Sequence, residues 1–153
     1  MRPELTKRAD YAIRAMLALS GSSGEGPISA RLIAEDWSIP VRFLPQVLGD
    51  LGRAGLVRAE PGRNGGYRLG RPASAISLLD IIEAVEGDSR RRSCVLRGGP
   101  CGASGECAVH AVFAEAQDAL LTTLSAANLG ELSGLRTAAR RVPVGQGPGQ
   151  SPT

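Results

Sequence analysis

The sequence predicts a mainly helical fold with one small β-hairpin, an α+β arrangement of the winged helix-turn-helix type followed by a long C-terminal dimerisation helix. Three observations predict this fold class. Two short amphipathic helical segments flank a tight turn at 38–40, a glycine-rich turn between two β-prone runs follows at 60–66, and an apolar stripe at helical spacing occupies 108–127. The length of 153 residues allows one compact domain with appendages.

The first helical segments show both periodicity and start signals. Residues 5–20 carry apolar side chains at the 3.6-residue period, and Thr6 is suited to cap this helix. Ser29 is a candidate cap for a second, shorter helix, and Ser77 for another at 76–85. Each of these three predicted helices therefore has a candidate residue for its N-terminal cap.

A third helical segment, predicted from about residue 41 to residue 54, completes a helix-turn-helix, whose second helix enters the major groove of DNA with its N-terminal residues. Arg42 and Gln46 lie one helical turn apart on one face, and Asp50 also falls between the apolar positions. Pro45 lacks an N–H group and is tolerated only in a first turn, so the helix can begin a residue or two later. A plain helical hairpin with solvated side chains is the alternative interpretation.

The next segment predicts the hairpin, or wing, of a winged helix. Residues 56–59 and 67–69 are short β-prone runs, and the turn between them is rich in residues that accept positive φ. An arginine at a small, flexible tip is suited to a narrow, A·T-rich minor groove. The polar and basic side chains around this turn are Arg58, Arg63, Asn64 and Arg68.

All three cysteines and the single histidine fall within one short segment. They are Cys94, Cys101, Cys107 and His110. Thiolate and imidazole groups bind iron and zinc, and the glycine-rich sequence between the cysteines predicts a loop able to wrap an ion or a cluster. If the following run is helical, Cys107 and His110 share a face of its first turn. We interpret the segment as an iron or iron–sulfur site.

Other interpretations of the same cysteines stay open. Three cysteines and one histidine are an accepted set for a closed structural zinc site, although zinc sites usually use Cys-x2–4-Cys pairs and the gaps here are longer. Three buried thiols without metal are a further possibility. A disulfide is disfavoured by the odd number of cysteines.

The charge distribution favours nucleic acid as a partner. Residues 1–71 contain 11 of the 18 Lys+Arg but only 7 of the 15 Asp+Glu, and all but one of the basic residues are arginine, which binds phosphates and guanine edges bidentately. We find no catalytic constellation and no apolar run of the roughly 18 residues that a membrane helix needs. We therefore expect no enzyme, no small-molecule substrate and no membrane partner, and a cytoplasmic location in which thiols stay reduced.

The C-terminal part contains the longest predicted helix. A small domain needs a partner for so long an apolar stripe, which predicts a dimer, and packing on its own domain is the alternative. The stripe consists of Val109, Phe113, Ala116, Leu120, Leu124 and Ala127. The predicted division of the chain is a winged helix-turn-helix DNA-binding domain at 1–87, a cluster-binding loop at 88–107, the dimerisation helix with a terminal short helix at 108–141, and a disordered tail at 142–153.

Several motifs together resemble a known family. They are Leu5-Thr-Lys-x-x-Asp10-Tyr-Ala-Ile, Ile39-Pro-x-x-Phe-Leu-x-Gln46, Ala54-Gly-Leu-Val57, Gly62-Arg-Asn-Gly-Gly-Tyr-Arg-Leu-Gly70 and the three-cysteine loop. Over about residues 1–135 the chain resembles the IscR/NsrR-type family of winged-helix iron–sulfur transcriptional regulators. This resemblance implies a homodimer that binds a palindromic operator in double-stranded DNA, and an iron–sulfur cluster on the three cysteines whose state alters DNA binding.

The resemblance also implies roles for individual residues. Cys94, Cys101 and Cys107 match the cluster cysteines. His110 matches the fourth ligand of a [2Fe–2S] site, which we favour, whereas Asp10 matches the position from which the partner subunit supplies a carboxylate to a [4Fe–4S] cluster. The residues implied in DNA binding are Arg42, Phe43, Gln46, Arg58, Arg63, Asn64 and Tyr67.

Two prolines depart from the family's pattern. Pro61 stands where the wing usually has an arginine, so Arg63 has to serve for the minor-groove contact, and Pro45 stands where IscR-type proteins use an acidic residue. The expected function is a dimeric transcriptional regulator, a repressor, that senses cluster status, redox state or nitric oxide. A zinc-stabilised or cofactor-free winged-helix DNA-binding protein and a small iron–sulfur electron carrier are the alternatives.

Overall fold

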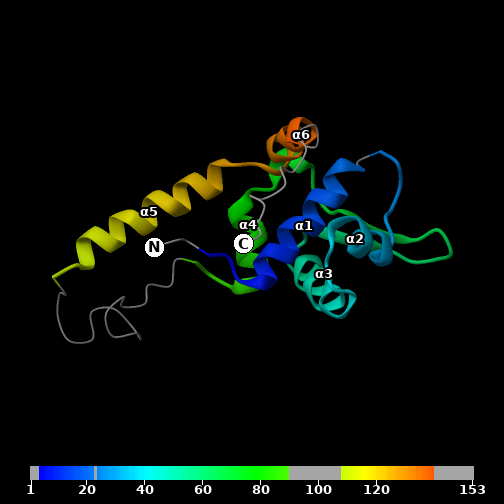
Figure 1. Ribbon diagram of the computed structural model, residues 1–153, viewed down its shortest axis with the longest axis horizontal. Coiled ribbons are helices and arrows are strands. Elements are labelled where there is room, and N and C mark those ends of the chain that lie inside the picture. The colour runs from blue at the N-terminus through cyan, green and yellow to red at the C-terminus, as the bar shows by residue number, and fades with distance from the viewer. Residues whose placement is uncertain (1–3, 23, 90–107, 140–153) are drawn as a thin grey trace, which may run out of the picture.

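The computed structural model describes residues 4–22, 24–89 and 108–139 and confirms the predicted fold class (Figure 1). The elements in chain order are α1 (Lys7–Gly21), α2 (Ala30–Trp37), the 3-10 turn η1 (Val41–Phe43), α3 (Leu44–Arg53), β1 (Val57–Glu60), β2 (Gly66–Leu69), the 3-10 turn η2 (Ala73–Ala75), α4 (Leu78–Glu86), α5 (His110–Ala126) and α6 (Leu129–Ala139). In Figure 1, α1 to α4, α6 and the hairpin gather into one body, while α5 extends away from it as an arm.

α1 is the central helix of the body and packs against α2, α3, α4 and α6. Its buried face consists largely of alanines, of which Ala9, Ala12 and Ala15 are fully buried. Because alanine has no side chain beyond Cβ, the neighbouring helices can approach α1 closely, and larger side chains such as Met16 and Leu51 fill the remaining space. The core is thereby built with few aromatic rings.

The predicted helix starts are confirmed by their caps. Thr6 and Ser29 accept hydrogen bonds from backbone N–H groups three residues further on, at 3.2 and 3.3 Å, in front of α1 and α2. Ser77 and Asp80 form a reciprocal capping box in front of α4, with N···O distances of 3.0 and 2.9 Å. Each cap supplies an acceptor to N–H groups that the helix itself leaves unpaired.

The predicted third helix begins later than residue 41. Residues Val41–Phe43 form the 3-10 turn η1, and α3 begins at Leu44 with Pro45 in its first turn. Proline is tolerated there because the N–H groups of a first turn have no partner within the helix. Arg42 therefore projects from the 3-10 turn and Gln46 from the α-helix, so the two residues do not belong to one continuous helix as predicted.

The wing is held to the body along its return strand. β1 and β2 are antiparallel, with Glu60 opposite Gly66. Ile28, in the loop before α2, exchanges backbone hydrogen bonds of 2.9 and 2.8 Å with Tyr67 of β2. A Cβ atom at Gly66 would lie 2.4 Å from the Ile28 carbonyl oxygen. The glycine is thus required for the close approach of wing and loop.

Gly66→Ala is expected to destabilise the protein by about 1–3 kcal/mol, the usual cost of forcing an extra methyl group into occupied space. The obstructing atoms belong to the Ile28 backbone, which cannot rotate away as a side chain can. Thermal unfolding followed by circular dichroism measures the change. Gly21→Ala is the matched control, because a Cβ atom there would meet nothing within 4 Å. Equal melting temperatures for the two variants would contradict the close approach.

α6 returns the chain to the body after the arm. Leu129 is fully buried, and its N–H donates to the Ile76 carbonyl oxygen at 2.8 Å. The Ser133 hydroxyl lies 2.7 Å from the Ser20 hydroxyl on α1. The C-terminal end of α5 is therefore connected to the body through α6.

α5 itself has no buried residue in this chain. Leu124, near its C-terminal end, packs against the core, whereas Phe113 and Leu120 are 40% and 47% exposed. The predicted apolar stripe is present but largely uncovered. Within the described ranges, no helix combines the length and the apolar character needed to cross a membrane.

Candidate nucleic-acid interface and metal centre

The exposed side of η1 and of the first turn of α3 is the predicted DNA-reading surface. The opposite side of α3 is buried in the core and fixes the rotation of the helix through Leu44, Val47, Leu48 and Leu51. Four neighbouring residues are consequently exposed, and we define them as the recognition surface: Val41, Arg42, Pro45 and Gln46. Arginine and glutamine offer donors for guanine and adenine edges, and valine and proline offer apolar contacts for thymine methyl groups.

Arg42 lies over one ring of an aromatic pair. Its Cζ atom lies 4.8 Å from the centroid of the Phe43 ring, and that centroid lies 5.4 Å from the centroid of Tyr11 on α1, with an interplanar angle of 33°. Phe43, predicted as a DNA-binding residue, is half-buried and contacts both neighbours. The cation–π contact restricts the guanidinium without occupying its N–H donors.

The Asp50 side chain forms ion pairs with arginines of its own chain. Its side chain is 11% exposed, its Oδ2 lies 2.5 Å from Nη2 of Arg8 on α1, and its other oxygen pairs with Arg53. Although its spacing placed it among the recognition residues, Asp50 instead ties α3 to α1. The recognition surface therefore carries no carboxylate.

The wing presents two arginines and an asparagine. Arg58, Arg63 and Asn64 are exposed. Arg68, directly opposite Arg58 in the hairpin, pairs with Glu60 through Nε–Oε1 at 2.5 Å and Nη2–Oε2 at 3.3 Å. This ion pair offsets the repulsion between the two facing arginines and commits Arg68 to the protein.

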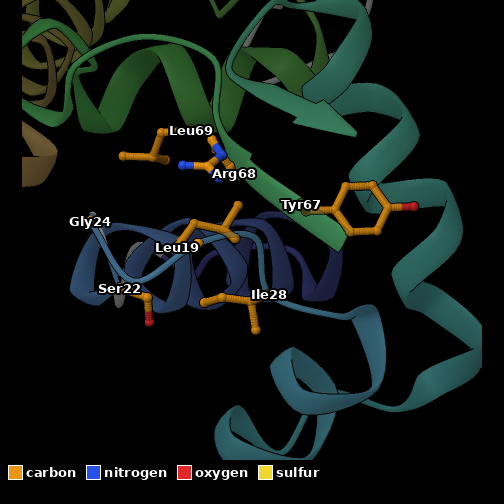
Figure 2. A pocket seen from close by; sticks show the side chains of 8 residues that line it. Leu19, Ser22, Gly24, Ile28, Tyr67, Arg68 and Leu69 are labelled. Carbon is orange, nitrogen blue, oxygen red and sulfur yellow. The ribbon is translucent and has the colours of Figure 1, made fainter. Parts of the chain in front are cut away.

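A small pocket lies at the base of the wing (Figure 2). It has a volume of about 170 Å³ and is lined by the end of α1, the loop before α2 and β2. Figure 2 shows the Tyr67 ring directed away from the other labelled side chains, and Tyr67 packs against the core as a half-buried residue. The pocket is smaller than the roughly 300 Å³ at which small-molecule sites begin. Tyr67 thus anchors the wing on the body, and its contact with DNA stays a prediction.

The predicted metal ligands lie only partly within the described residues. Those outside are Cys94, Cys101 and Cys107. His110 is the first residue of α5 and is half-buried. Asp10 lies in the first turn of α1, with its Oδ1 2.9 Å from Nε of Arg14. Over 4–22, 24–89 and 108–139, no three acidic or histidine side chains gather as a metal site, so a metal centre would depend on the cysteines.

The two candidate fourth ligands occupy different parts of the chain. His110 opens α5, whose N-terminal end lies at the far end of the arm in Figure 1, whereas Asp10 lies on α1 inside the body. The structure does not bring them together within one chain. They are therefore alternatives rather than joint ligands of one protomer's site.

Both ends of the cysteine segment lie beside α5. Ser89, the last described residue before it, accepts a hydrogen bond on its carbonyl oxygen from Nε2 of Gln117 at 2.9 Å. The N–H of Ser89 donates to Oε1 of Glu83 on α4 at 3.2 Å. α5 begins at His110, about two helical turns before Gln117, which is about 10 Å along the helix axis. The described chain thus stops at Ser89, where α4 meets α5, and resumes at the N-terminal end of α5.

Sequence patterns show no sign of three residues whose contacts hold the helices of the body together. They are Tyr11, Arg8 and Glu86, which contact Phe43, Asp50 and Thr6 respectively. Each contact joins elements far apart in the sequence, and helical periodicity carries no signal for such pairs. The three-residue spacing of Asp50 and Arg53 was the available sign that this carboxylate has a partner within the protein.

A helix-turn-helix with an exposed arginine and glutamine, followed by an arginine-tipped hairpin, defines the class as a winged helix-turn-helix DNA-binding protein. The model of the Rrf2 family, described as iron-dependent transcriptional regulators, matches residues 5–134. The chain belongs to this family, in agreement with the resemblance noted in the sequence.

Individual relatives agree with this assignment. The chain is 35% identical over 128 residues to the HTH-type transcriptional regulator IscR of Escherichia coli, covering 84% of this chain and 78% of the relative. The structure of CymR, the global cysteine regulator of B. subtilis, matches with a TM-score of 0.76 and 29% identity over 88% of this chain and 98% of CymR. T. potens IscR matches with a TM-score of 0.72 and 26% identity over 93% of both chains. These relatives are transcriptional regulators and not enzymes.

Proposed function

We propose that this protein is a homodimeric, cytoplasmic repressor that binds a palindromic operator and senses an iron–sulfur cluster held by Cys94, Cys101 and Cys107. The observation that carries the proposal is the position of the cysteine segment, which begins after Ser89 at the junction of α4 and α5 and ends at the N-terminal end of α5. That junction connects the body, which carries the recognition surface, to the arm with the uncovered apolar stripe. The iron dependence described for the matching family supports iron as the metal.

The DNA-binding part of the proposal rests on the recognition surface and the wing. Arg42 and Gln46 are exposed at the start of α3, the end that enters a major groove. Arg58, Arg63 and Asn64 are exposed on the wing, where they are suited to phosphates and to the minor groove. A symmetric dimer would place two such units on half-sites about one turn of DNA apart, which makes the operator a palindrome.

His110 is the favoured fourth ligand. It follows Cys107 by three residues and opens α5, whereas the carboxylate of Asp10 already lies 2.9 Å from the guanidinium of Arg14. Three cysteines and a histidine suit a [2Fe–2S] cluster, and the [4Fe–4S] cluster is the alternative with Asp10. Either cluster supplies one-electron redox chemistry and reactivity towards oxidants and nitric oxide.

A continuous set of contacts leads from the cysteine segment to α3. Ser89 forms hydrogen bonds with a residue of α4 and a residue of α5. Glu86, at the end of α4, accepts a hydrogen bond from Thr6 in front of α1. Arg8 of α1 pairs with Asp50 of α3. We expect cluster binding to favour one arrangement of these helices, and it can change DNA affinity only by stabilising that arrangement more than the other.

A metal-free or zinc-stabilised regulator is the second candidate. The observation that favours it is the similarity in fold to CymR, described as a cysteine regulator, at a TM-score of 0.76. The fold is thus compatible with more than one signal. The cysteine segment favours a metal-binding regulator over a metal-free one, because three thiols and an imidazole so close together in the sequence supply a metal-binding donor set that DNA binding alone does not need. The same donor set also suits zinc, so identification of the bound metal distinguishes a cluster from a zinc site.

Anaerobic purification followed by an absorbance spectrum and assays of iron, acid-labile sulfide and zinc on the same sample tests the proposal. We expect a brown protein with iron and sulfide in equal amounts, and retardation of DNA that weakens steeply as salt is raised. A colourless protein with stoichiometric zinc would overturn the cluster and leave the DNA-binding part. A coloured protein that binds no DNA would support an electron carrier instead.

A further inference from the structure

The arginines around α3 differ in how their charges are used. Arg8 and Arg53 share the carboxylate of Asp50, so part of their charge and of their hydrogen-bond donors is used within the protein. Arg42 instead contacts the Phe43 ring, which neither neutralises its charge nor accepts conventional hydrogen bonds. Arg42 is thus the arginine of the recognition surface that keeps both its charge and its five N–H donors for a ligand.

The aromatic pair restricts where this guanidinium can lie. An exposed arginine has many rotamers, and ordering it on binding costs conformational entropy. The Phe43 ring under Cζ of Arg42 reduces that freedom beforehand, and the contact of Phe43 with Tyr11 anchors the ring to the central helix of the body. The three side chains form a row from the core to the recognition surface, and we refer to them as the stack.

We propose that Tyr11 and Phe43 are positioning residues that hold Arg42 ready to read a guanine, and that each operator half-site contains a guanine read by Arg42. This inference rests on the proposed DNA-binding function. A guanidinium donates two parallel hydrogen bonds to O6 and N7 of guanine, the commonest specific contact in the major groove. Cytosine is read through its N4 amino group by a carboxylate, and the carboxylate of α3 is held by Arg8 and Arg53.

Selection of bound sequences from a random double-stranded DNA library tests the inference without a known operator. The wild-type protein should enrich a palindrome with a guanine in each half-site. Arg42→Ala should lose the preference at that position alone, with the ratio of guanine to adenine affinity falling about 10-fold or more. Arg42→Lys keeps the charge but not the planar guanidinium that donates two parallel hydrogen bonds. It should therefore lose the same preference while retaining the salt dependence of binding.

Variants of the ring separate positioning from DNA contact. Phe43→Leu should lower the same guanine preference roughly threefold by removing the cation–π contact, and Phe43→Tyr, which keeps a ring, should restore it. Arg53→Ala is the matched control, because this exposed arginine of α3 pairs with Asp50 and its loss should leave the selected sequence unchanged. Thermal melting verifies that each variant is folded, and the exposed Arg42 can be changed without disturbing the core.

The outcomes distinguish the inference from the function on which it rests. If the wild-type protein enriches no sequence, the proposed function fails and the guanine assignment fails with it. If the wild-type protein enriches a palindrome and Arg42→Ala enriches the same one, the function stands and the role of Arg42 is overturned. If Arg42→Ala loses the guanine while Phe43→Leu retains it in full, Arg42 reads the base and the positioning role of the stack is overturned.

Discussion

Cys94→Ala is expected to yield a protein without iron or acid-labile sulfide, because removal of one of three thiolates leaves too few sulfur ligands to retain a cluster. Its affinity for the operator should differ from that of the cluster-loaded protein by about 5-fold to 100-fold, the usual range of coupling between two linked sites. Metal and sulfide assays measure the first effect. Titration of a labelled operator, identified by the library selection, measures the second under anaerobic conditions.

The neighbouring substitution Ser93→Ala is the matched control for this experiment, because it alters the same segment without removing a thiol. It should retain iron, sulfide and the wild-type operator affinity. Retention of a full complement of iron and sulfide by Cys94→Ala would remove that cysteine from the site. Loss of the cluster with no change in operator binding would exclude the sensing mechanism while leaving the metal site in place.

Leu120→Arg is expected to give a monomer that binds the operator at least 100-fold more weakly. Leu120 lies in the uncovered stripe of α5 at 47% exposure, and an arginine there would bring two like charges together in a symmetric interface. A dimer binds both half-sites of a palindrome as one unit, and this advantage is typically worth two or more orders of magnitude. Analytical ultracentrifugation measures the assembly state, and operator titration measures the affinity.

Thr122→Arg is the matched control, because Thr122 is exposed on α5 at a position half a turn from the stripe. It should remain a dimer with unchanged operator affinity. A dimeric Leu120→Arg variant would show that the stripe is not the interface. A monomeric variant with full operator affinity would show instead that the two half-sites are read independently.

The elements of this fold could be predicted because their signals are local. A serine or threonine three residues ahead of its backbone partner defines each cap, and the glycine-rich turn of the wing lies between two adjacent strands. The late start of α3 was also foreseeable, because Pro45 restricts the residues immediately around it. None of these features depends on knowing which helix packs against which.

The candidate site was less predictable because its supporting contacts are tertiary. The spacing of Asp50 on α3 suggested a DNA-facing side chain, yet Arg8, from a helix far earlier in the chain, withdraws it from that surface. Phe43 was expected to contact DNA, and only the position of Tyr11 shows that it has a partner within the protein. The amino-acid sequence alone does not show which side chains of different helices contact one another.

The absence of any buried residue on α5 has a consequence for how the protein behaves on dilution. Most of the stability of a helix in a protein comes from packing of its apolar face, and α5 receives little such support from its own chain. If the partner subunit provides the missing support, folding of the arm and association of the subunits are a single equilibrium governed by mass action. The end of α5 that directly follows the cysteines in the sequence would then be helical only at concentrations where the subunits associate, so the number of molecules in a cell would itself set how many of them can hold a metal.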